Sequence, residues 1–377
     1  MIERRMQKVV EKRLYKGKAI VIIGPRQVGK TTLVKSIVEN LKNKTVLWLN
    51  GDEAETRELL SNTNSARLKA IVGQHEIVVI DEAQRIVNIG LTLKLLVDNV
   101  PTTQLIVTGS SVLELADEIN EPLTGRKFEY FLFPLSFTEM VDATNLFEEM
   151  KLLEHRMIFG YYPEIVTNPG EEVELLQLLS GSYLYKDILK LGSVKKPPLL
   201  EKILQALAFQ MGNEVSYHEL SQLVGADAKT VERYIDLLEK SYVVFRLTSF
   251  SRNLRNELKK SRKIYFYDIG IRNSIIRNFS PTSMRQDIGA LWENFLISER
   301  MKFNQLSGRW VNSYFWRTHT RQEIDYIEEY DGVLHAYEFK WNPKKRAKPP
   351  KIFFDSYPDA TWHVVTKDNF EQFIFSS

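Results

Sequence analysis

The chain has 377 residues, a length that predicts two to four domains rather than a single core. Hydrophobic residues make up 44% and charged residues 26%, as in ordinary soluble globular proteins. The formal net charge is only +3, so a surface for nucleic acid must be a local patch rather than the whole molecule.

Three further features concern the compartment. The longest apolar runs, such as Ala19–Ile23, are too short to span a membrane. The charged start Met1–Arg5 predicts no signal peptide. The chain contains no cysteine, which excludes disulfides, thiol nucleophiles and zinc–cysteine sites. We therefore expect a cytoplasmic protein without a membrane partner.

Short β-branched runs alternate with helical stretches in the first third of the chain, which is typical of a parallel α/β sheet. We expect helices at residues 30–41, 53–72 and 92–99. The expected strands are Ala19–Ile23, Val46–Leu49, Ile77–Ile80, Leu105–Thr108 and Phe128–Phe133. The sequence pattern changes at Pro134, so the first domain is expected to cover residues 1–135.

A phosphate-binding loop follows the first expected strand. Residues 24–31 fit the pattern G-x-x-x-x-G-K-[ST], in which glycines let backbone N–H groups cradle phosphates at the start of a helix. Lys30 is expected to reach the β- and γ-phosphates, and Thr31 to ligate magnesium. We therefore predict that ATP and Mg²⁺ are bound by Gly24, Pro25, Arg26, Gln27, Val28, Gly29, Lys30, Thr31 and Thr32.

An acidic pair ends the third expected strand. Asp81 and Glu82 would lie at the carboxyl edge of the sheet, where ligands bind in such folds. Asp81 is expected to hold magnesium through water, and Glu82 to act as the base for the attacking water. The hydroxyl of Ser110 or Ser111 either senses the γ-phosphate or caps a helix. Together these residues predict ATP hydrolysis.

Four segments resemble the AAA+ ATPases: Gly24–Thr32, Asp81–Gln84, Thr108–Ser111 and Leu123–Arg126. Nearly the whole chain resembles the prokaryotic members that carry a C-terminal domain of uncharacterised function. Gly160–Glu164 and Tyr183–Asp187 are similar to the middle segment of that subfamily. The resemblance implies that Arg126 acts on the γ-phosphate of a neighbour in a homo-oligomer. The alternative is a surface arginine at the start of a strand.

The middle of the chain is helical. We expect a helical lid over residues 136–196, and a winged helix-turn-helix over residues 197–280 that begins at Pro197–Pro198. The two helices of the motif lie within Tyr217–Lys240, and two strands near residues 243–247 and 263–267 would form the wing. Its apolar positions are Leu220, Leu223, Val224, Val231, Tyr234, Ile235 and Leu238.

DNA is the partner that this motif predicts. A recognition helix would present Lys229, Thr230 and Arg233 to the bases and backbone. A basic stretch between the wing strands would neutralise phosphates: Arg252, Arg255, Lys259, Lys260, Arg262 and Lys263, opposed only by Glu257. The alternative is a winged helix that contacts a protein partner, with these residues solvated.

The last segment, residues 281–377, is predicted to be α+β with a hairpin at Asp331–Gly332. If Tyr330 pairs with Val333, Asp325 faces Glu338 and Glu323 faces Lys340. The opposite face is then apolar, with Ile324, Tyr326, Tyr337 and Phe339. Opposed carboxylates repel each other unless a cation lies between them.

This hairpin is similar to the core of the PD-(D/E)xK nucleases, which implies a restriction-endonuclease-like fold. In that resemblance Asp325 and Glu338 bind a metal, Glu293 adds an acid from a helix, and Lys340 positions the attacking water. The alternative is that Asp325, Glu338 and Lys340 form an ordinary solvent-exposed face of the hairpin without a catalytic role. The sequence therefore predicts a magnesium-dependent AAA+ ATPase that acts on DNA. Its alternative is a nucleotide switch that binds a protein, with an inactive C-terminal domain.

Overall fold

The computed structural model describes residues 2–110, 117–184, 194, 196–251, 261–318, 320 and 322–375. They fall into two compact units, residues 1–135 with 240–242 and residues 136–239 with 243–377. Within the described ranges, no helix combines the length and the apolar character that crossing a bilayer requires.

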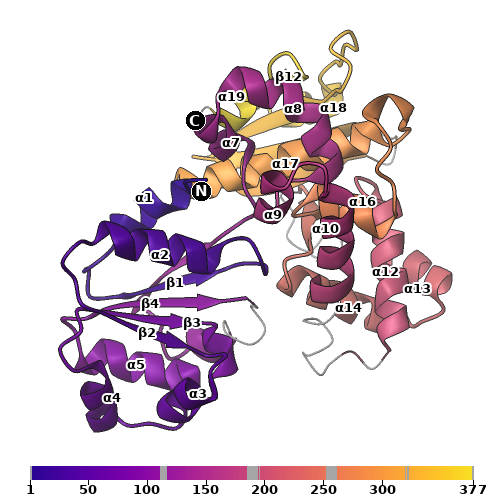
Figure 1. Ribbon diagram of the computed structural model, residues 1–377. Coiled ribbons are helices and arrows are strands. Elements are labelled where there is room, and N and C mark those ends of the chain that lie inside the picture. The colour runs from indigo at the N-terminus through magenta and orange to yellow at the C-terminus, as the bar shows by residue number, and fades with distance from the viewer. Residues whose placement is uncertain are drawn as a thin grey trace. The chain divides into compact units, whose positions relative to one another are not determined.

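The first unit is built on a five-stranded parallel sheet with the order β2-β3-β4-β1-β5, which confirms the predicted α/β sheet. The three inner strands are buried along their whole length, because helices cover both faces. Figure 1 shows α1 and α2 on one face and α3, α4 and α5 on the other. The strands are β1 (Ala19–Ile23), β2 (Val46–Asn50), β3 (Ile77–Asp81), β4 (Gln104–Gly109) and β5 (Lys127–Phe131).

The helices of this unit differ from the prediction in several places. Helices at Arg5–Glu11 and Asp117–Asn120 are not predicted, and the helix expected from residue 92 begins at Ile89. The single helix expected over residues 53–72 is instead two helices, because Asn64 caps the second by accepting a hydrogen bond from the N–H of Arg67 at 3.0 Å. The helical elements are α1 (Arg5–Glu11), α2 (Lys30–Asn40), α3 (Ala54–Leu60), α4 (Ser65–Val72), η1 (Ala83–Arg85), α5 (Ile89–Asn99) and α6 (Asp117–Asn120).

The second unit begins with helices and ends in a mixed seven-stranded sheet of order β12-β11-β10-β9-β7-β8-β6. Its strands are β6 (Glu214–Val215), β7 (Val244–Ser249), β8 (Arg262–Phe266), β9 (Asn312–Arg317), β10 (Glu323–Tyr330), β11 (Val333–Phe339) and β12 (Thr361–Val365). Its helices are α7 (Phe137–Ala143), α8 (Leu146–Phe159), α9 (Pro163–Thr167), α10 (Glu172–Leu178), η3 (Leu179–Leu184), α12 (Pro197–Phe209), α13 (Tyr217–Val224), α14 (Ala228–Lys240), α16 (Ile269–Ile275), η4 (Thr282–Met284), α17 (Ile288–Leu306), α18 (Lys351–Ser356) and α19 (Phe370–Phe375).

The strands expected to form the wing, β7 and β8, are part of this larger sheet. Strand β7 pairs with β8 on one side and, in parallel, with β9 on the other, through Thr248 opposite Tyr314 and Ser249 opposite Phe315. The two predicted wing strands therefore pair with each other as expected, but β9 joins them to the rest of the sheet. A free wing would leave the outer edge of β7 unpaired, and β9 supplies the partner that such an edge needs.

The helix pair α13–α14 is present at the predicted place, joined by Gly225–Asp227. All the expected apolar positions are buried except Leu223, which is 67% exposed. Helix α13 is buried along Leu220 and Val224, a spacing of four residues, and Leu223 lies off that stripe. Leu223 is therefore an apolar position of the motif that does not belong to its buried face.

The β10–β11 hairpin has the predicted register, because Tyr330 pairs with Val333 and Tyr326 with Tyr337. The apolar face is not continuous as expected. A β-bulge between Ile324 and Ile327 breaks the alternation on β10, and Ile324 packs with Ile327 in one core cluster. Tyr326 and Tyr337 instead lie beside Phe373 of α19.

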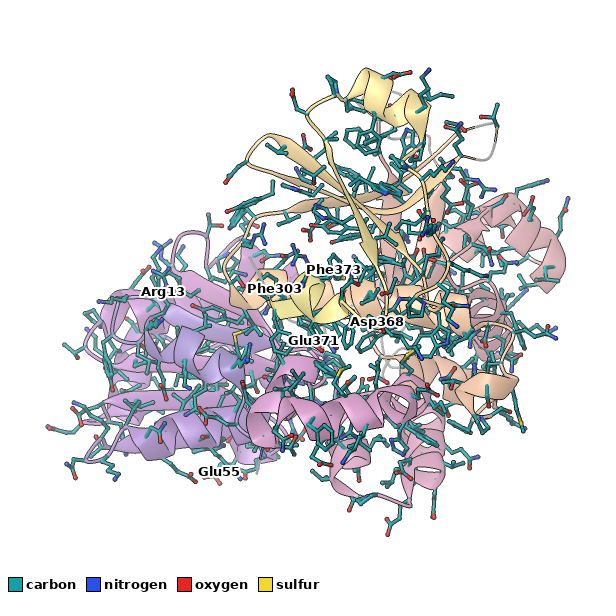
Figure 2. All side chains as sticks on the ribbon, turned by 90° about the horizontal axis from the view of Figure 1, so that it is seen from above. Arg13, Glu55, Phe303, Asp368, Glu371 and Phe373 are labelled. Atoms are coloured by element: carbon teal, nitrogen blue, oxygen red, sulfur yellow. The ribbon has the colours of Figure 1, made fainter. Side chains whose placement is uncertain are left out.

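Helix α17 is fixed to this sheet by a buried charge pair. Arg300 donates to Glu328 through Nε at 2.9 Å and Nη2 at 2.7 Å, and their side chains are 4% and 0% exposed. The guanidinium also lies over the rings of Phe303 and Phe373, which Figure 2 shows close together. Since both charges are paired in a bidentate geometry, their burial is tolerated.

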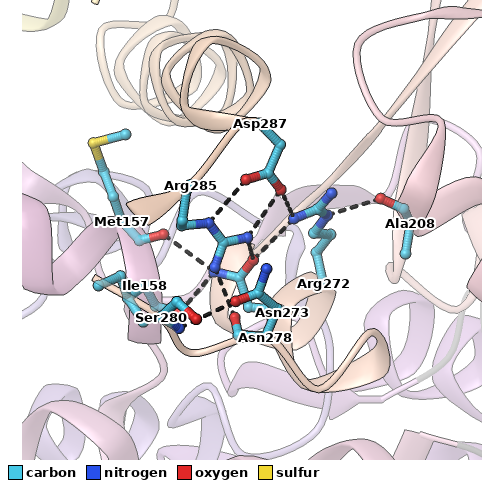
Figure 3. Close-up of polar contacts among 9 residues, drawn as sticks. All are labelled: Met157, Ile158, Ala208, Arg272, Asn273, Asn278, Ser280, Arg285 and Asp287. Atoms are coloured by element: carbon cyan, nitrogen blue, oxygen red, sulfur yellow. Dashed lines mark hydrogen bonds and ion pairs between the residues drawn. The ribbon is translucent and has the colours of Figure 1, made fainter. Parts of the chain in front are cut away.

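A second buried network joins α16 to the start of α17 (Figure 3). Asp287 accepts hydrogen bonds from Arg272 at 2.5 Å and from Arg285 at 2.9 Å. Arg272 also donates to the carbonyl of Ala208 on α12, and Asn273 donates to that of Ile158 on α8, both at 2.8 Å. This network ties the helical segment of the unit to its sheet-bearing segment.

Candidate functional site

The phosphate loop of the first unit has the backbone that its glycines predict. Gly29 has φ +91° and Gln27 has φ +60°, both in the left-handed region that turns backbone N–H groups inward. A Cβ atom at Gly24 would lie 2.3 Å from the carbonyl oxygen of Leu132, so only glycine fits there. Val28, a residue of the loop, is fully buried.

Lys30 is 5% exposed and lies within the loop. Its Nζ donates to the carbonyl oxygens of Gly24 at 2.9 Å and Pro25 at 2.8 Å. A phosphate held by the loop offers the same ammonium a charged acceptor, which makes a stronger hydrogen bond than a neutral carbonyl. The lysine is therefore positioned at the phosphate site by the loop itself.

The two expected magnesium ligands are in contact. Thr31 Oγ1 donates to Asp81 Oδ2 at 2.9 Å, and Thr108 donates to the other carboxylate oxygen. Hydroxyl and carboxylate oxygens are the hard donors that Mg²⁺ prefers. The residues present therefore fit the ion that a phosphate loop uses.

Glu82 is held in place by Gln84 and Thr108, in contacts that the sequence does not predict. Its Oε2 accepts a hydrogen bond from Gln84 Nε2 at 2.5 Å, and the same nitrogen donates to Ser110 Oγ at 2.8 Å. Its backbone N–H donates to Thr108 Oγ1 at 3.1 Å. Ser110 is thus joined to Glu82 through Gln84, while Ser111 lies outside the described residues. Gln84 ends the Asp81–Gln84 run, which was the available signal.

Arg4 is a further residue that sequence reasoning missed. It is 9% exposed, and its guanidinium donates to the carbonyls of Val28 and Phe133, both at 2.7 Å. It therefore connects the phosphate loop to the chain that follows β5. Its position far before the motif gave no signal in the sequence.

Arg126 does not approach the phosphate loop of its own chain. Its carbonyl accepts from the N–H of Ala19 at the amino edge of the sheet, whereas the loop follows Ile23 at the carboxyl edge. Its Nε pairs with Asp98 Oδ1 at 2.7 Å. Binding of the chain's own nucleotide by Arg126 is therefore not supported, and action on a neighbour's nucleotide stays a prediction.

The second unit brings the four residues of the predicted nuclease core into one cluster. Lys340 Nζ lies 2.5 Å from Glu338 Oε1, and Asp325 Oδ2 accepts from the backbone N–H of Phe339 at 2.8 Å. Burial and the neighbouring Asp325 charge raise the pKa of Glu338 to about 6. Burial also raises the pKa of Glu293 to about 7, with Asp325 again adding to the effect.

Lys263 is the unexpected member of this carboxylate cluster. The sequence predicts that it contacts DNA phosphates, but its side chain is 2% exposed and lies 2.9 Å from Glu293 and 2.6 Å from Glu323. Tyr265 also donates to Glu293 at 2.5 Å. Burial opposes the charge on Lys263, but the surrounding carboxylates outweigh it and raise its pKa. Glu293 is therefore paired with a lysine rather than placed as a free metal ligand.

Among the residues that the structure describes, no group of three or more His, Cys, Asp or Glu side chains is arranged to hold a metal ion. Glu293 is paired with Lys263, which leaves Asp325 and Glu338 as the two remaining acids of the predicted nuclease core. Magnesium is commonly held by only one or two carboxylates with water. In addition, Glu338 Oε2 is buried without a hydrogen-bond partner in the described part of the chain.

The predicted DNA surface is only partly described. Lys229 and Arg233 are exposed on α14, as a recognition helix requires. Arg262 instead forms a cation–π contact within the protein, since its guanidinium lies 4.3 Å from the ring centroid of Tyr217. The predicted contacts Arg252, Arg255, Lys259 and Lys260, with the opposing Glu257, lie outside the described residues, as do Tyr185, Lys186 and Asp187 of the middle segment.

Comparison with known proteins supports the class of the first unit. Residues 16–141 match the family model described as AAA domain, so this part of the chain is an AAA-type ATPase domain, which implies binding of a nucleotide, typically with magnesium. Residues 150–282 and 288–374 match two models described as domains of unknown function, DUF8612 and DUF4143.

The relatives extend over most of the chain. An uncharacterised protein of Mycobacterium tuberculosis is 26% identical over 350 residues, covering 90% of this chain and 74% of the relative. One of Methanocaldococcus jannaschii is 22% identical over 360 residues, covering 89% and 78%. The structure of the Walker-type ATPase of Pyrococcus abyssi is similar with a TM-score of 0.50 at 14% identity, covering 73% of this chain and 96% of that one. This likeness concerns the fold alone.

Proposed function

We propose that the first unit hydrolyses ATP with magnesium. Lys30 holds the β- and γ-phosphates, Thr31 and Asp81 hold the ion, and Glu82 accepts a proton from the attacking water. The observation that carries this proposal is the 2.9 Å contact between Thr31 Oγ1 and Asp81 Oδ2, since it joins the loop to the acidic strand end. Bound magnesium would neutralise charge on the phosphates.

The link from Glu82 through Gln84 to Ser110 supports a refinement of this mechanism. In the present arrangement one amide nitrogen bonds both the Glu82 carboxylate and the Ser110 hydroxyl. A γ-phosphate near Ser110 would compete for those hydrogen bonds. Competition would free Glu82 to turn toward water when ATP is bound.

The test measures ATP binding and turnover separately. Lys30→Ala should lose ATP binding, and Glu82→Gln should bind ATP but turn over at least about 100-fold more slowly, as expected for the loss of a general base. Lys42→Ala, an exposed lysine of the same unit, is the matched control. Equal ATP affinity in the wild type and Lys30→Ala would refute the proposal.

A second activity, cleavage of DNA, is supported by the carboxylate cluster of the second unit. Its carrying observation is Glu338 Oε2, which is buried without a hydrogen-bond partner among the described residues and belongs to the same cluster as Asp325 and Lys340. Asp325 and Glu338 would hold a hard divalent ion, which would supply Lewis-acid activation of the phosphodiester. Lys340 would orient water, and Lys263 would neutralise Glu293 so that the acids tolerate their burial.

Circular and linear DNA with magnesium or manganese is the substrate for this test. Wild-type chain should cleave, Asp325→Ala and Lys340→Ala should not, and all three should turn over ATP equally. Asp359→Ala, an exposed aspartate of the same unit, is the control. If the wild type neither cleaves DNA nor binds manganese more tightly than Asp325→Ala, the cluster is structural. The favoured function is then a nucleotide switch with a protein partner.

A further inference from the structure

A cavity of about 490 Å³ lies in the second unit, where β11 and β12 meet α19 and the end of α17. Its lining includes His335 and Tyr337, whereas Glu338 projects from the other face of β11, because side chains alternate along a strand. The cavity is therefore separate from the carboxylate cluster. Its volume is within the usual range of small-molecule sites.

The charge of this cavity is positive. Arg300 and Arg309 both border it, and none of its described lining residues is acidic. Arg300 is neutralised by Glu328, but Arg309 forms no ion pair within the described ranges. Two nitrogens of Arg309, Nε and Nη1, are buried without a hydrogen-bond partner among the described residues, and its guanidinium stacks on Tyr330 at 4.2 Å. Two buried guanidinium nitrogens that lack an acceptor among the described residues favour the binding of an anion.

Two histidines supply further hydrogen-bonding groups. His335 Nδ1 and His363 Nε2 lie 3.0 Å and 3.1 Å from the same hydroxyl, Thr361 Oγ1. Burial lowers the pKa of both rings, so both are neutral near pH 7. The single proton of Thr361 can be donated to only one ring. That ring then carries its own proton on its other nitrogen, which can donate to a ligand.

A stacked pair of aromatic rings adjoins these groups. The rings of Tyr337 and His363 stack with centroids 5.3 Å apart and an interplanar angle of 25°. His363 is exposed, so this pair is open to a ligand. Planar rings such as nucleobases stack on aromatic side chains with little dependence on their identity.

We propose that this cavity binds a small phosphate-bearing ligand with a planar ring, of the nucleoside monophosphate class. Arg309 takes the phosphate, because a guanidinium matches phosphate oxygens in geometry and charge. One histidine adds a second donor, and the Tyr337–His363 pair stacks on the ring. This site is independent of the ATP site in the first unit.

The test uses the full chain with Lys30→Ala, so that the phosphate loop does not contribute, and measures AMP binding by calorimetry. AMP should bind more tightly than adenosine or inorganic phosphate, because only AMP has both groups. Arg309→Ala should weaken AMP binding by about tenfold or more, as expected for losing a charged hydrogen bond. Arg346→Ala removes an exposed arginine of the same unit and should leave affinity unchanged.

His363→Ala, a change at an exposed position, serves as a second variant if Arg309→Ala does not fold, and should also weaken AMP binding. Absence of AMP binding to the Lys30→Ala chain would overturn the proposal. So would equal affinity in His363→Ala and Arg346→Ala. Binding of inorganic phosphate as tight as that of AMP would overturn the part of the proposal that concerns the ring.

Discussion

Glu82 has a backbone that a non-glycine residue rarely adopts. Its φ is +51°, in the left-handed region, which costs on the order of 1 kcal/mol or more for an ordinary side chain. The neighbouring Gly51 makes the conformation possible, since a Cβ there would lie 2.4 Å from the Glu82 carbonyl oxygen. The orientation of the Glu82 carboxylate, which is proposed to be catalytic, therefore depends on Gly51 at the end of the adjacent strand β2.

Gly51→Ala tests this dependence. The added methyl group must displace the Glu82 backbone, so ATP turnover should fall by about tenfold or more while ATP affinity stays nearly constant. Gly289→Ala, where a Cβ has open space, should change neither quantity. A normal turnover rate in Gly51→Ala would show that the glycine does not position Glu82.

At the scale of elements, the Asp287 network joins three helices to the start of α17. The two arginines hold the pKa of Asp287 below its ordinary value of 3.8, at about 2, although partial burial acts in the opposite direction. A carboxylate whose pKa is lowered by folding stabilises the fold above its unfolded pKa. That contribution is lost as the pH falls from about 4 toward 2.

Asp287→Asn should therefore lower the free energy of unfolding at pH 7 by about 1–2 kcal/mol, with allowance for the partial exposure of Asp287. Urea denaturation at pH 7, 5, 4 and 3 measures the difference in the free energy of unfolding between the wild type and the variant. The difference should be constant from pH 7 to 5 and should narrow below pH 4. Asp359→Asn, at an exposed position, should show no such difference. A difference independent of pH would contradict the assignment.

At the scale of the whole molecule, a net charge of +3 leaves DNA binding to local surfaces. Lys263 is withdrawn from any such surface by its burial, and Arg262 is engaged with Tyr217. Among the predicted DNA contacts in the described residues, Lys229 and Arg233 of α14 remain exposed. They are the residues on which the DNA hypothesis now depends most directly.

If the chain binds DNA through α14, the logarithm of the DNA affinity should fall linearly with the logarithm of the salt concentration. Lys229→Glu with Arg233→Glu should reduce the magnitude of that slope by about 2, since each phosphate contact contributes about 0.9. Lys42→Glu with Lys69→Glu makes the same charge change in the first unit and is the control. No binding at low salt, or equal slopes in both double variants, would favour a protein partner.

The sequence by itself determined the features that depend on local pattern. The phosphate loop, its flanking strand and helix, and the acidic pair at Asp81–Glu82 follow from short-range spacing of glycines, apolar runs and charges. The hairpin register follows from the Asp331–Gly332 turn, because a two-residue turn fixes the pairing of both strands.

Only the tertiary structure decided what depends on contacts between distant residues. The pairing of β7 with β9 makes the expected wing part of a larger sheet, and no local pattern specifies which strand occupies an edge. From the sequence, Lys263 is expected to be a solvent-exposed basic residue, yet the fold places it between Glu293 and Glu323. The role of Arg4 was hidden for the same reason, because its guanidinium bonds the carbonyl of Phe133. Hydrogen bonds between residues that are far apart in the sequence depend on tertiary packing. The spacing of residues along the chain does not reveal that packing.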